Sequence, residues 1–164
     1  MSKPNLLVVS PPDHYALRNL AQIKELATVS ISNDEAEIQK IGKDADLILY
    51  TGLTGKTVAF TKVWPHTTKV QWVHSLSAGV EKVLVVSDFR ESPVPLTNAR
   101  GVFKRSLAEF AVLGMLYFTK RVRRLVDSQR ARKWDDFSTE FLENKIVGIV
   151  GYGEIGRECA LLAR

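Results

Sequence analysis

The stretch IVGIVGYGEIGRECALLAR, residues 146–164, decides the fold class of the chain. Residues 146–150 are predicted to form a buried β-strand, because branched apolar side chains dominate them. Three glycines follow in the spacing G-x-G-x-x-G, at Gly151, Gly153 and Gly156, and a helix is expected directly behind them. A strand, this glycine pattern and a helix are typical of the start of a Rossmann dinucleotide-binding domain, where the backbone closely approaches a pyrophosphate.

The residues before this stretch alternate between short apolar runs and longer segments of helical periodicity. Asp34 and Glu37 form a capping-box pattern at the start of one helical segment. Strands that alternate with helices predict an α/β fold with a flavodoxin-like, doubly wound parallel sheet. The expected strands are 6–9, 28–31, 47–50, 70–73 and 94–96, and the expected helices are 15–26, 34–41, 56–63 and 78–88.

Composition is that of a soluble globular protein. The 164 residues are 45% hydrophobic and 25% charged, which suits one domain or a small domain with part of a second. The single cysteine, Cys159, excludes an internal disulfide framework and fits a reducing compartment. The longest nearly apolar run, residues 107–118, contains Glu109 and is shorter than the ~20 residues of a membrane span. We therefore expect a cytoplasmic protein without a membrane segment.

The net charge of +5 is concentrated in residues 120–133, where Asp127 is the single acid. A cluster of this kind could bind nucleic acid. No aromatic interleaving or base-reading motif accompanies it, so we favour a solvated helix face and keep nucleic-acid binding as an alternative. The cations are Lys120, Arg121, Arg123, Arg124, Arg130, Arg132 and Lys133.

Ligands of open parallel sheets bind at the carboxyl ends of the strands, so the loops there are candidate sites. In YTGLTGKT, residues 50–57, the glycines are too close together for a phosphate loop, and a plain strand-to-helix turn is favoured. In HSLSAGVE, residues 74–81, small residues leave backbone N–H groups near a helix N-terminus, which suits a carboxylate. A purely structural turn is the alternative for this second loop.

The third loop is TNARGVFKRSLAEF, residues 97–110. Ser106 and Glu109 form a second capping-box pattern, which predicts that a helix begins after Ser106. This helix, 107–118, is apolar on nearly every face, so another domain or another subunit is expected to cover it.

Three motifs together carry a family resemblance: WVHSLSAGVE, LTNARGVFKRSLAEF and LENKIVGIVGYGEIGRECA. In this order and spacing they make the chain similar to the amino-terminal half of D-isomer-specific 2-hydroxyacid dehydrogenases, the family of glyoxylate, hydroxypyruvate and phosphoglycerate dehydrogenases. Family members usually carry glycine where Asn144 stands, and asparagine is the next best residue for a left-handed turn. The resemblance implies two regions, residues 1–101 as part of a substrate domain and 102–164 as the start of an NAD(P)-binding domain.

The resemblance also implies the roles of individual residues. The backbone N–H groups of Ala78 and Gly79 would hold the substrate carboxylate. The pyrophosphate of NAD or NADP would lie on Gly151, Gly153 and Gly156, with the N–H groups of Glu154 and Ile155 facing the phosphates, so the Glu154 carboxylate must point away. A homodimer through the region of helix 107–118 is implied as well, and no metal is expected.

The catalytic residues of the family, an Arg, a Glu and a His, would all lie beyond residue 164, so no catalytic residue is assigned in this chain. Of the three histidines, His74 stands beside the carboxylate loop, and a structural role is favoured for it over a catalytic one. The chain is therefore expected to be an inactive fragment of an oxidoreductase that acts on a small 2-keto acid with NAD(P)H. The alternative classes are a non-catalytic NAD-binding or oligomerisation module and nucleic-acid binding through 120–133.

Overall fold

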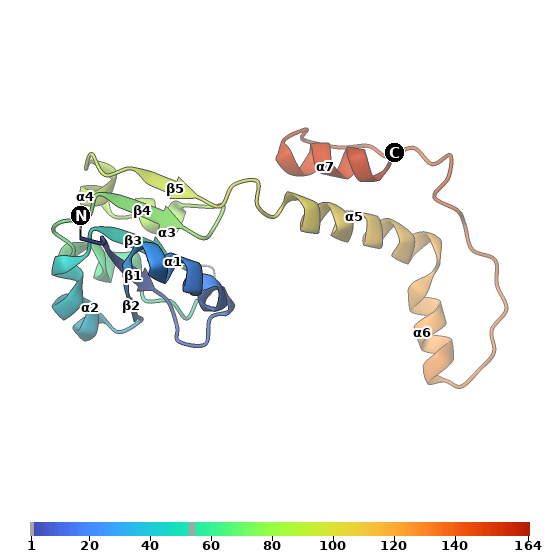
Figure 1. Cartoon of the computed structure of the whole chain (residues 1–164). Coiled ribbons are helices and arrows are strands. Elements are labelled where there is room, and N and C mark those ends of the chain that lie inside the picture. The colour runs from blue at the N-terminus through green and yellow to red at the C-terminus, as the bar shows by residue number, and fades with distance from the viewer. Residues whose placement is uncertain (1, 53–54) are drawn as a thin grey trace. The chain divides into compact units, whose positions relative to one another are not determined.

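A computed structural model describes residues 2–52 and 55–164 (Figure 1). The chain divides into two compact units, Met1–Arg100 and Gly101–Arg164. The boundary expected from the sequence, between residues 101 and 102, lies one residue from this division. The functional roles assigned to the two regions stay predictions.

The first unit is built on a five-stranded sheet whose strands are all parallel, in the order β2-β1-β3-β4-β5. This order is that of the flavodoxin-like doubly wound folds, so the predicted fold class is confirmed. The strands are β1 (Asn5–Val9), β2 (Thr28–Ser32), β3 (Leu47–Tyr50), β4 (Trp72–Ser75) and β5 (Leu96–Asn98).

The carboxyl ends of the five strands are in register. Val9 pairs with Ser32 and Tyr50, and Ser75 pairs with Tyr50 and Asn98, so the last residues of all strands form one row. The loops that follow these residues therefore leave the sheet at a single edge, which is where ligands of such folds bind.

Two strands begin two residues later than the sequence predicts. The ladder of β5 begins at Leu96 because Pro95 has no N–H to donate, although its carbonyl still accepts from Val73 at 3.0 Å. Val70, at the expected start of β4, is buried in the core before the strand begins. The apolar run thus marks burial, and the hydrogen-bonded strand lies further along.

Helical segments connect the strands, several of them single turns. They are η1 (Tyr15–Asn19), α1 (Leu20–Leu26), α2 (Glu35–Ile41), η2 (Gly42–Asp44), η3 (Phe60–Lys62), η4 (Trp64–His66), α3 (Glu81–Leu84) and α4 (Ser87–Arg90). The predicted helix 56–63 is wrong, because one 3₁₀ turn forms there. The predicted helix 78–88 is split at Val85 and Val86, where β-branched residues lower the helix propensity and Val86 is extended.

The predicted cap of α2 is confirmed. The side chain of Asp34 accepts a hydrogen bond from the N–H of Glu37 at 2.9 Å. The Glu37 carboxylate does not return to the Asp34 N–H directly; it accepts from the Ser32 hydroxyl at 2.6 Å, and that hydroxyl accepts from the Asp34 N–H at 3.2 Å. Ser32 thereby relays the second half of the capping box.

The sheet has one well-covered face and one partly covered face. Leu7, Ile48 and Val73 on the first face pack with residues of α2, η3, α3 and α4, including Ile38, Phe60, Val83 and Phe89. On the second face, Leu6 and Val8 pack with Leu20 of α1 and with Ala27, which directly follows α1. Strand β4 contributes Trp72 and His74 to the second face, since side chains alternate along a strand. Trp72 has an exposed fraction of 43%, and His74 is half-buried.

The second unit consists of α5 (Lys104–Thr119), α6 (Val122–Arg130), a long irregular segment and α7 (Glu154–Leu162). Helices α5 and α7 lie side by side (Figure 1). All residues of this unit are described, and Ala108 is its only buried apolar residue. Over the described residues of the chain, no helix combines the length and apolar character that crossing a membrane requires.

The strand predicted at 146–150 is wrong. These residues are irregular, and the side chain of Ile146 is 99% exposed. A strand requires a neighbouring strand to bond its N–H and C=O groups, and residues 101–164 provide none. Asn144, just before this segment, has the expected left-handed backbone, with φ +63°.

The predicted start of the long apolar helix is also wrong. Helix α5 begins at Lys104, so Ser106 lies inside its first turn and caps nothing. Gly101, with φ +82°, turns the chain early enough for the helix to begin two residues before Ser106. Glu109 instead accepts a hydrogen bond from Arg105, one turn before it, at 2.9 Å.

Candidate functional site

The loop of residues 75–80, here named the carboxylate loop, leaves the sheet at the carboxyl end of β4. Its first turn is fixed by Leu76, whose N–H donates to the Tyr50 carbonyl at 3.0 Å, and by Ser77, whose N–H donates to the Ser75 hydroxyl at 3.2 Å. The Ser77 carbonyl accepts from the Ala99 N–H at 3.2 Å. The loop is thus held by both neighbouring strands.

Ala78 and Gly79, the predicted carboxylate-binding residues, are the exposed tip of this loop. The Ala78 carbonyl is turned toward β5, where it accepts from the Asn98 side chain at 2.8 Å. Within the described residues, no acceptor is bonded to the N–H of Ala78 or of Gly79. Two exposed N–H groups on a tethered loop can hold one carboxylate.

Gly79 has close neighbours on its side-chain side. A Cβ at this position would lie 2.5 Å from a carboxylate oxygen of Glu81, the first residue of α3. Any larger residue there must displace the Glu81 side chain. The absence of a side chain at Gly79 therefore leaves room for the Glu81 carboxylate, and the backbone here does not have a positive φ.

A small cavity of about 100 Å³ lies beside the carboxylate loop. Burial raises the pKa of the Tyr50 phenol in its wall, so this group stays neutral, and it donates to the Val58 carbonyl at 3.0 Å. Gly79 lines the cavity, and sequence reasoning missed the single cation of its wall, Lys82. The lining residues are Tyr50, Gly52, Ser75, Ser77, Gly79, Glu81, Lys82 and Val83.

The loop YTGLTGKT, residues 50–57, is interpreted from the sequence as a plain turn. Residues 53 and 54 lie outside the described part of the chain. The segment after them is held by Asn33, whose side chain donates to the Lys56 carbonyl and accepts from the Val58 N–H, both at 2.8 Å.

Residues 151–156 of the second unit are here named the glycine loop. Each of its three glycines has a different backbone or steric environment. Gly151 has φ +89°, which side chains rarely adopt. A Cβ on Gly156 would collide with the Gly151 carbonyl oxygen. Around Gly153, a Cβ would meet nothing within 4 Å, so this side of the loop is open. A tight turn, a close helix contact and an open approach to the backbone are the three roles of the dinucleotide fingerprint.

The predicted helix is present, but α7 begins at Glu154, inside the glycine loop rather than behind it, with Gly153 as its N-cap. The Arg157 N–H donates to the Gly153 carbonyl at 2.9 Å and closes the first turn. The N–H groups of Glu154 and Ile155 are in this first turn, where they have no partner within the helix. They lie at the positive end of the helix dipole, which favours an anion.

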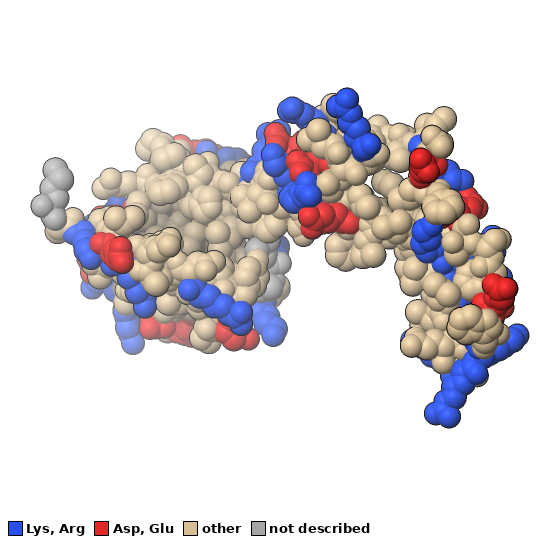
Figure 2. Space-filling view, turned by 45° about the vertical axis from the view of Figure 1, so that its right-hand side comes forward, with Lys and Arg blue, Asp and Glu red and all other residues tan. Residues whose placement is uncertain are grey.

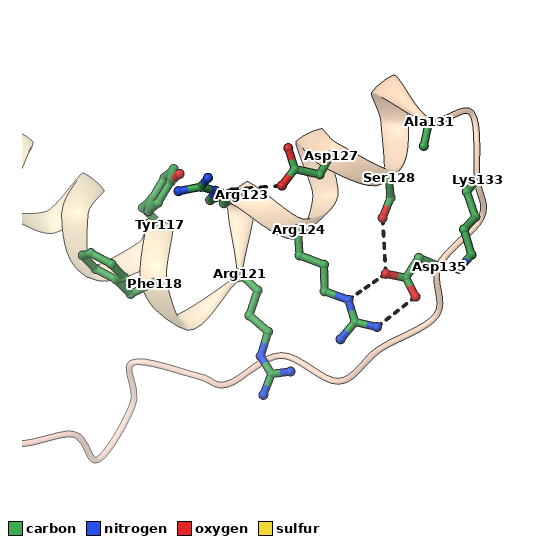
Figure 3. Close-up of a pocket in the computed structure, with 10 residues that line it drawn as sticks. All are labelled: Tyr117, Phe118, Arg121, Arg123, Arg124, Asp127, Ser128, Ala131, Lys133 and Asp135. Atoms are coloured by element: carbon green, nitrogen blue, oxygen red, sulfur yellow. Dashed lines mark hydrogen bonds and ion pairs between the residues drawn. The ribbon is translucent and has the colours of Figure 1, made fainter.

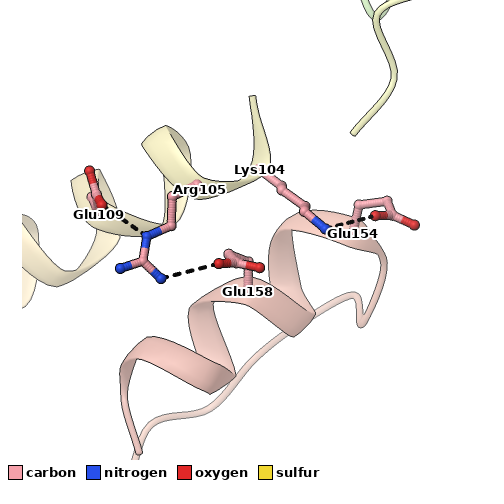
Figure 4. Close-up of polar contacts among 5 residues, drawn as sticks. All are labelled: Lys104, Arg105, Glu109, Glu154 and Glu158. Atoms are coloured by element: carbon pink, nitrogen blue, oxygen red, sulfur yellow. Dashed lines mark hydrogen bonds and ion pairs between the residues drawn. The ribbon is translucent and has the colours of Figure 1, made fainter. Parts of the chain in front are cut away.

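The Glu154 side chain points toward α5 (Figure 4). Its carboxylate lies 3.9 Å from the ammonium of Lys104. One turn further on, Glu158 lies 3.3 Å from the guanidinium of Arg105, which also bonds Glu109 at 2.9 Å. Hydrogen bonds to Glu109 and Glu158 raise the pKa of Arg105. Charged pairs thus connect α5 and α7 and draw the Glu154 carboxylate toward Lys104.

The His74 side chain forms a hydrogen bond with the neighbouring strand β5. Its Nδ1 atom lies 2.7 Å from the hydroxyl of Thr97, its register partner on β5, and the Trp72 indole donates to the same hydroxyl at 2.8 Å. Burial lowers the pKa of His74, which favours the neutral ring. The side chain lies outside the lining of the 100 Å³ cavity, in accord with the favoured structural role.

The basic segment 120–133 is partly neutralised by the irregular chain that follows it. Arg124 forms a two-pronged bond with Asp135, at 2.6 and 2.8 Å, which lowers the pKa of Asp135 to about 2 (Figure 3). Arg124 also lies over the ring of Phe137, at 4.3 Å from its centroid, and Lys120 donates to the Glu140 carbonyl at 2.6 Å.

On the face shown in Figure 2, acidic side chains stand beside basic ones in both units. A groove of about 730 Å³ beside α6 is lined by four cations, Arg121, Arg123, Arg124 and Lys133, and by two acids, Asp127 and Asp135. The solvated helix face and the nucleic-acid surface both stay predictions. Among residues 2–52 and 55–164, no group of three or more His, Cys, Asp or Glu could hold a metal ion.

Comparison with known proteins covers both units. Residues 112–164 match the family model of the D-isomer specific 2-hydroxyacid dehydrogenase NAD binding domain. A hydroxypyruvate reductase of Thermotoga maritima is 24% identical over 162 residues, which are 98% of this chain and 52% of that protein.

Several solved structures have the fold of this chain. A D-isomer specific 2-hydroxyacid dehydrogenase family protein from Aeromonas salmonicida has a TM-score of 0.79 at 22% identity, over 99% of this chain and 50% of its own. An NADPH-dependent glyoxylate/hydroxypyruvate reductase from Sinorhizobium meliloti, solved with NADP and malonate, has a TM-score of 0.63 at 19% identity, over 98% and 50%. The chain thus spans about half the length of the relatives it matches. The family model over residues 112–164 and the hydroxypyruvate reductase make the chain similar to D-isomer-specific 2-hydroxyacid dehydrogenases, and the solved structures show that it shares their fold.

Proposed function

We propose that the chain is the amino-terminal part of an oxidoreductase that transfers a hydride between NADH or NADPH and a small 2-keto or 2-hydroxy acid. Glyoxylate and hydroxypyruvate are the proposed substrates, in keeping with the relatives named above. The observation that carries the proposal is the pair of exposed N–H groups at Ala78 and Gly79, without acceptors among the described residues, at the carboxyl edge of the sheet. These N–H groups are the reason for proposing a substrate with a carboxylate. The glycine loop by itself would indicate only a dinucleotide.

The two loops divide the binding work. The N–H groups of Ala78 and Gly79 hold the carboxylate and orient the neighbouring carbonyl carbon. The glycine loop, with the N–H groups of Glu154 and Ile155, holds the pyrophosphate of the cofactor, whose nicotinamide ring supplies the hydride when bound. The cytoplasm is the proposed location.

Hydride delivery builds negative charge on the carbonyl oxygen, so the reaction needs a cation near this oxygen and an acid that protonates it. The family resemblance places these groups, and the acid that reads the cofactor ribose, beyond Arg164. We therefore propose that residues 1–164 contribute to the binding of both ligands in the longer protein, and that by themselves they have little affinity for the dinucleotide and do not catalyse the reaction. The choice between NAD and NADP rests with residues of the longer protein.

The proposal is tested in the longer protein by steady-state kinetics with glyoxylate and hydroxypyruvate. Gly79→Val should raise the KM for the keto acid at least tenfold, because a β-branched side chain at the loop tip crowds the N–H groups of Ala78 and Gly79 and displaces the Glu81 carboxylate. The KM for NADH should stay within twofold. Gly55→Val is the matched control, since a Cβ at Gly55 meets no described residue within 4 Å. An unchanged KM for the keto acid in Gly79→Val would remove the carboxylate loop from the site.

A homodimer through α5 is the second part of the proposal. Large apolar side chains are exposed along this helix, with Phe110 at 71% and Phe118 at 78%. Exposed large apolar side chains on one helix favour an interaction site there. Light scattering of the longer protein should give twice the monomer mass, and Phe110→Asp should shift it toward the monomer. A monomeric wild-type protein would contradict this part and leave the proposed reaction intact.

The same scaffold could serve as a non-catalytic binding or oligomerisation module. The residues that the family uses for catalysis decide between the two: a longer protein without the Arg, Glu and His would be such a module. Binding to DNA or RNA through residues 120–133 would instead weaken steeply with salt.

A further inference from the structure

Lys82 lies in the first turn of α3, directly behind the carboxylate loop. Its ammonium donates a hydrogen bond to the carbonyl of Gly52 at 3.0 Å. Gly52 follows β3, and the carboxylate loop follows β4, the neighbouring strand in the sheet. A single side chain therefore connects the segments that leave two adjacent strands.

The Lys82 ammonium makes no ion pair with the described residues. Helix α3 is a single turn, Glu81–Leu84, so its dipole neither favours nor disfavours the cation. The bond to the buried Gly52 carbonyl, a charge-assisted hydrogen bond, is the one interaction of the ammonium that the structure shows.

Lys82 and the two segments that it connects all line the 100 Å³ cavity beside the carboxylate loop. Tyr50 and Gly52 belong to the first segment, and Ser75, Ser77 and Gly79 belong to the second. At ~30 Å³ for each molecule of liquid water, the volume is that of about three water molecules. The hydrogen bond of Lys82 thus joins two parts of the lining of one cavity.

We propose that Lys82 is a positioning residue of the carboxylate-binding site. It holds the segment at Gly52 against α3 and so keeps the N–H groups of Ala78 and Gly79 in the arrangement that binds a substrate carboxylate. The inference rests on the proposed function, because it takes the carboxylate loop as the place where the 2-keto acid binds. It adds to that proposal a side chain that acts through the Gly52 carbonyl.

The test uses the 164-residue chain and two substitutions at one position. Lys82→Met keeps the aliphatic stem and removes the donor, whereas Lys82→Arg keeps a charged donor. The matched control is Lys69→Met, which removes a lysine whose partner is Asp44, at 3.2 Å on the protein surface. Each protein is titrated with glyoxylate, and the backbone amide signals of Ala78 and Gly79 are followed by NMR.

Wild type and Lys69→Met should give the same Kd for glyoxylate. Lys82→Met should weaken binding at least fivefold, and Lys82→Arg should restore it to within twofold of wild type. Urea unfolding of each variant separates this effect from a general loss of stability, since a role in folding alone would change the midpoint and leave Kd in place.

Two outcomes overturn the inference in different ways. Wild-type affinity in a folded Lys82→Met variant would remove Lys82 from the site while the carboxylate loop keeps its proposed role. Amide signals of Ala78 and Gly79 that do not respond to glyoxylate in the wild-type chain would contradict the proposed carboxylate site itself, and the role of Lys82 with it.

Discussion

The two units contain similar apolar sequence and bury very different amounts of it. Seventeen of the eighteen buried apolar residues identified in the described chain lie in Met1–Arg100, and Ala108 is the one in Gly101–Arg164. LLVV at 6–9 and IVGIV at 146–150 are both strand-like in sequence. The first lies in an interior strand of the sheet, and the second is largely exposed and irregular. An apolar run becomes a strand only where other strands bond its backbone.

The glycine loop shows the opposite behaviour. Its turn at Gly151 and its close approach at Gly156 form although residues 101–164 contain no strand. These features depend on residues within one short segment, so they do not need distant partners. Local backbone geometry and long-range pairing are thus separate requirements, and the second unit meets only the first.

The largest expected difference between the units is the cost of removing an aromatic side chain. Phe60 is 1% exposed and packs edge-on against Tyr50 and Phe89. Phe60→Ala should lower the free energy of unfolding by about 3–5 kcal/mol, because it leaves a cavity in the core. Phe110→Ala, its control on exposed α5, should change it by less than about 0.5 kcal/mol. Urea unfolding measures both, and equal losses would contradict the contrast drawn between the units.

Gly156→Ala sharpens the comparison by testing the local geometry of the second unit. The added Cβ collides with the Gly151 carbonyl, so the glycine loop must open. In the longer protein, affinity for NADH should fall at least tenfold, which corresponds to about 1.4 kcal/mol. Gly148→Ala, where the Cβ meets nothing within 4 Å, should leave the affinity unchanged. Fluorescence titration with NADH distinguishes the two, and equal affinities would exclude a steric role for Gly156.

A smaller effect is expected from pH in the second unit. Asp135, bonded by Arg124, has its pKa lowered from 3.8 to about 2. A carboxylate with a lowered pKa stabilises the folded arrangement above its unfolded pKa. This contribution should be complete above about pH 4 and disappear as the pH falls through 2. Arg124→Met should raise the Asp135 pKa toward its usual value, whereas Arg123→Met should not; NMR titration of the carboxyl carbon checks both.

Strands β1, β2 and β3 were predicted to within a residue because their apolar runs coincide with their hydrogen-bonded ladders. Val70 and Val94 misplaced β4 and β5, since both pack against the core outside the ladder. The pattern at Asp34 identified a cap, but that at Ser106 did not, because the turn at Gly101 sets the helix start.

In the candidate sites, the glycine pattern predicted local backbone geometry that the structure shows, namely the positive φ of Gly151 and the close approach at Gly156. The binding roles of these glycines, and those of Ala78 and Gly79 at the exposed loop tip, stay predictions. Lys82 was missed because its partner, the Gly52 carbonyl, lies about 30 residues earlier in the chain, in the segment that follows β3. The sequence contains no local pattern that connects the two residues.

The most direct test of the account compares the 164-residue chain with the longer protein, each titrated with NADH and then supplied with glyoxylate. The longer protein should bind NADH saturably and oxidise it with glyoxylate. The chain alone should show neither saturable binding nor turnover above background, because its glycine loop has no supporting strands and its residues supply no assigned acid or cation for the carbonyl. Turnover by the chain alone would place catalytic groups within residues 1–164, whereas a longer protein that neither binds NADH nor reduces a 2-keto acid would contradict the proposed function.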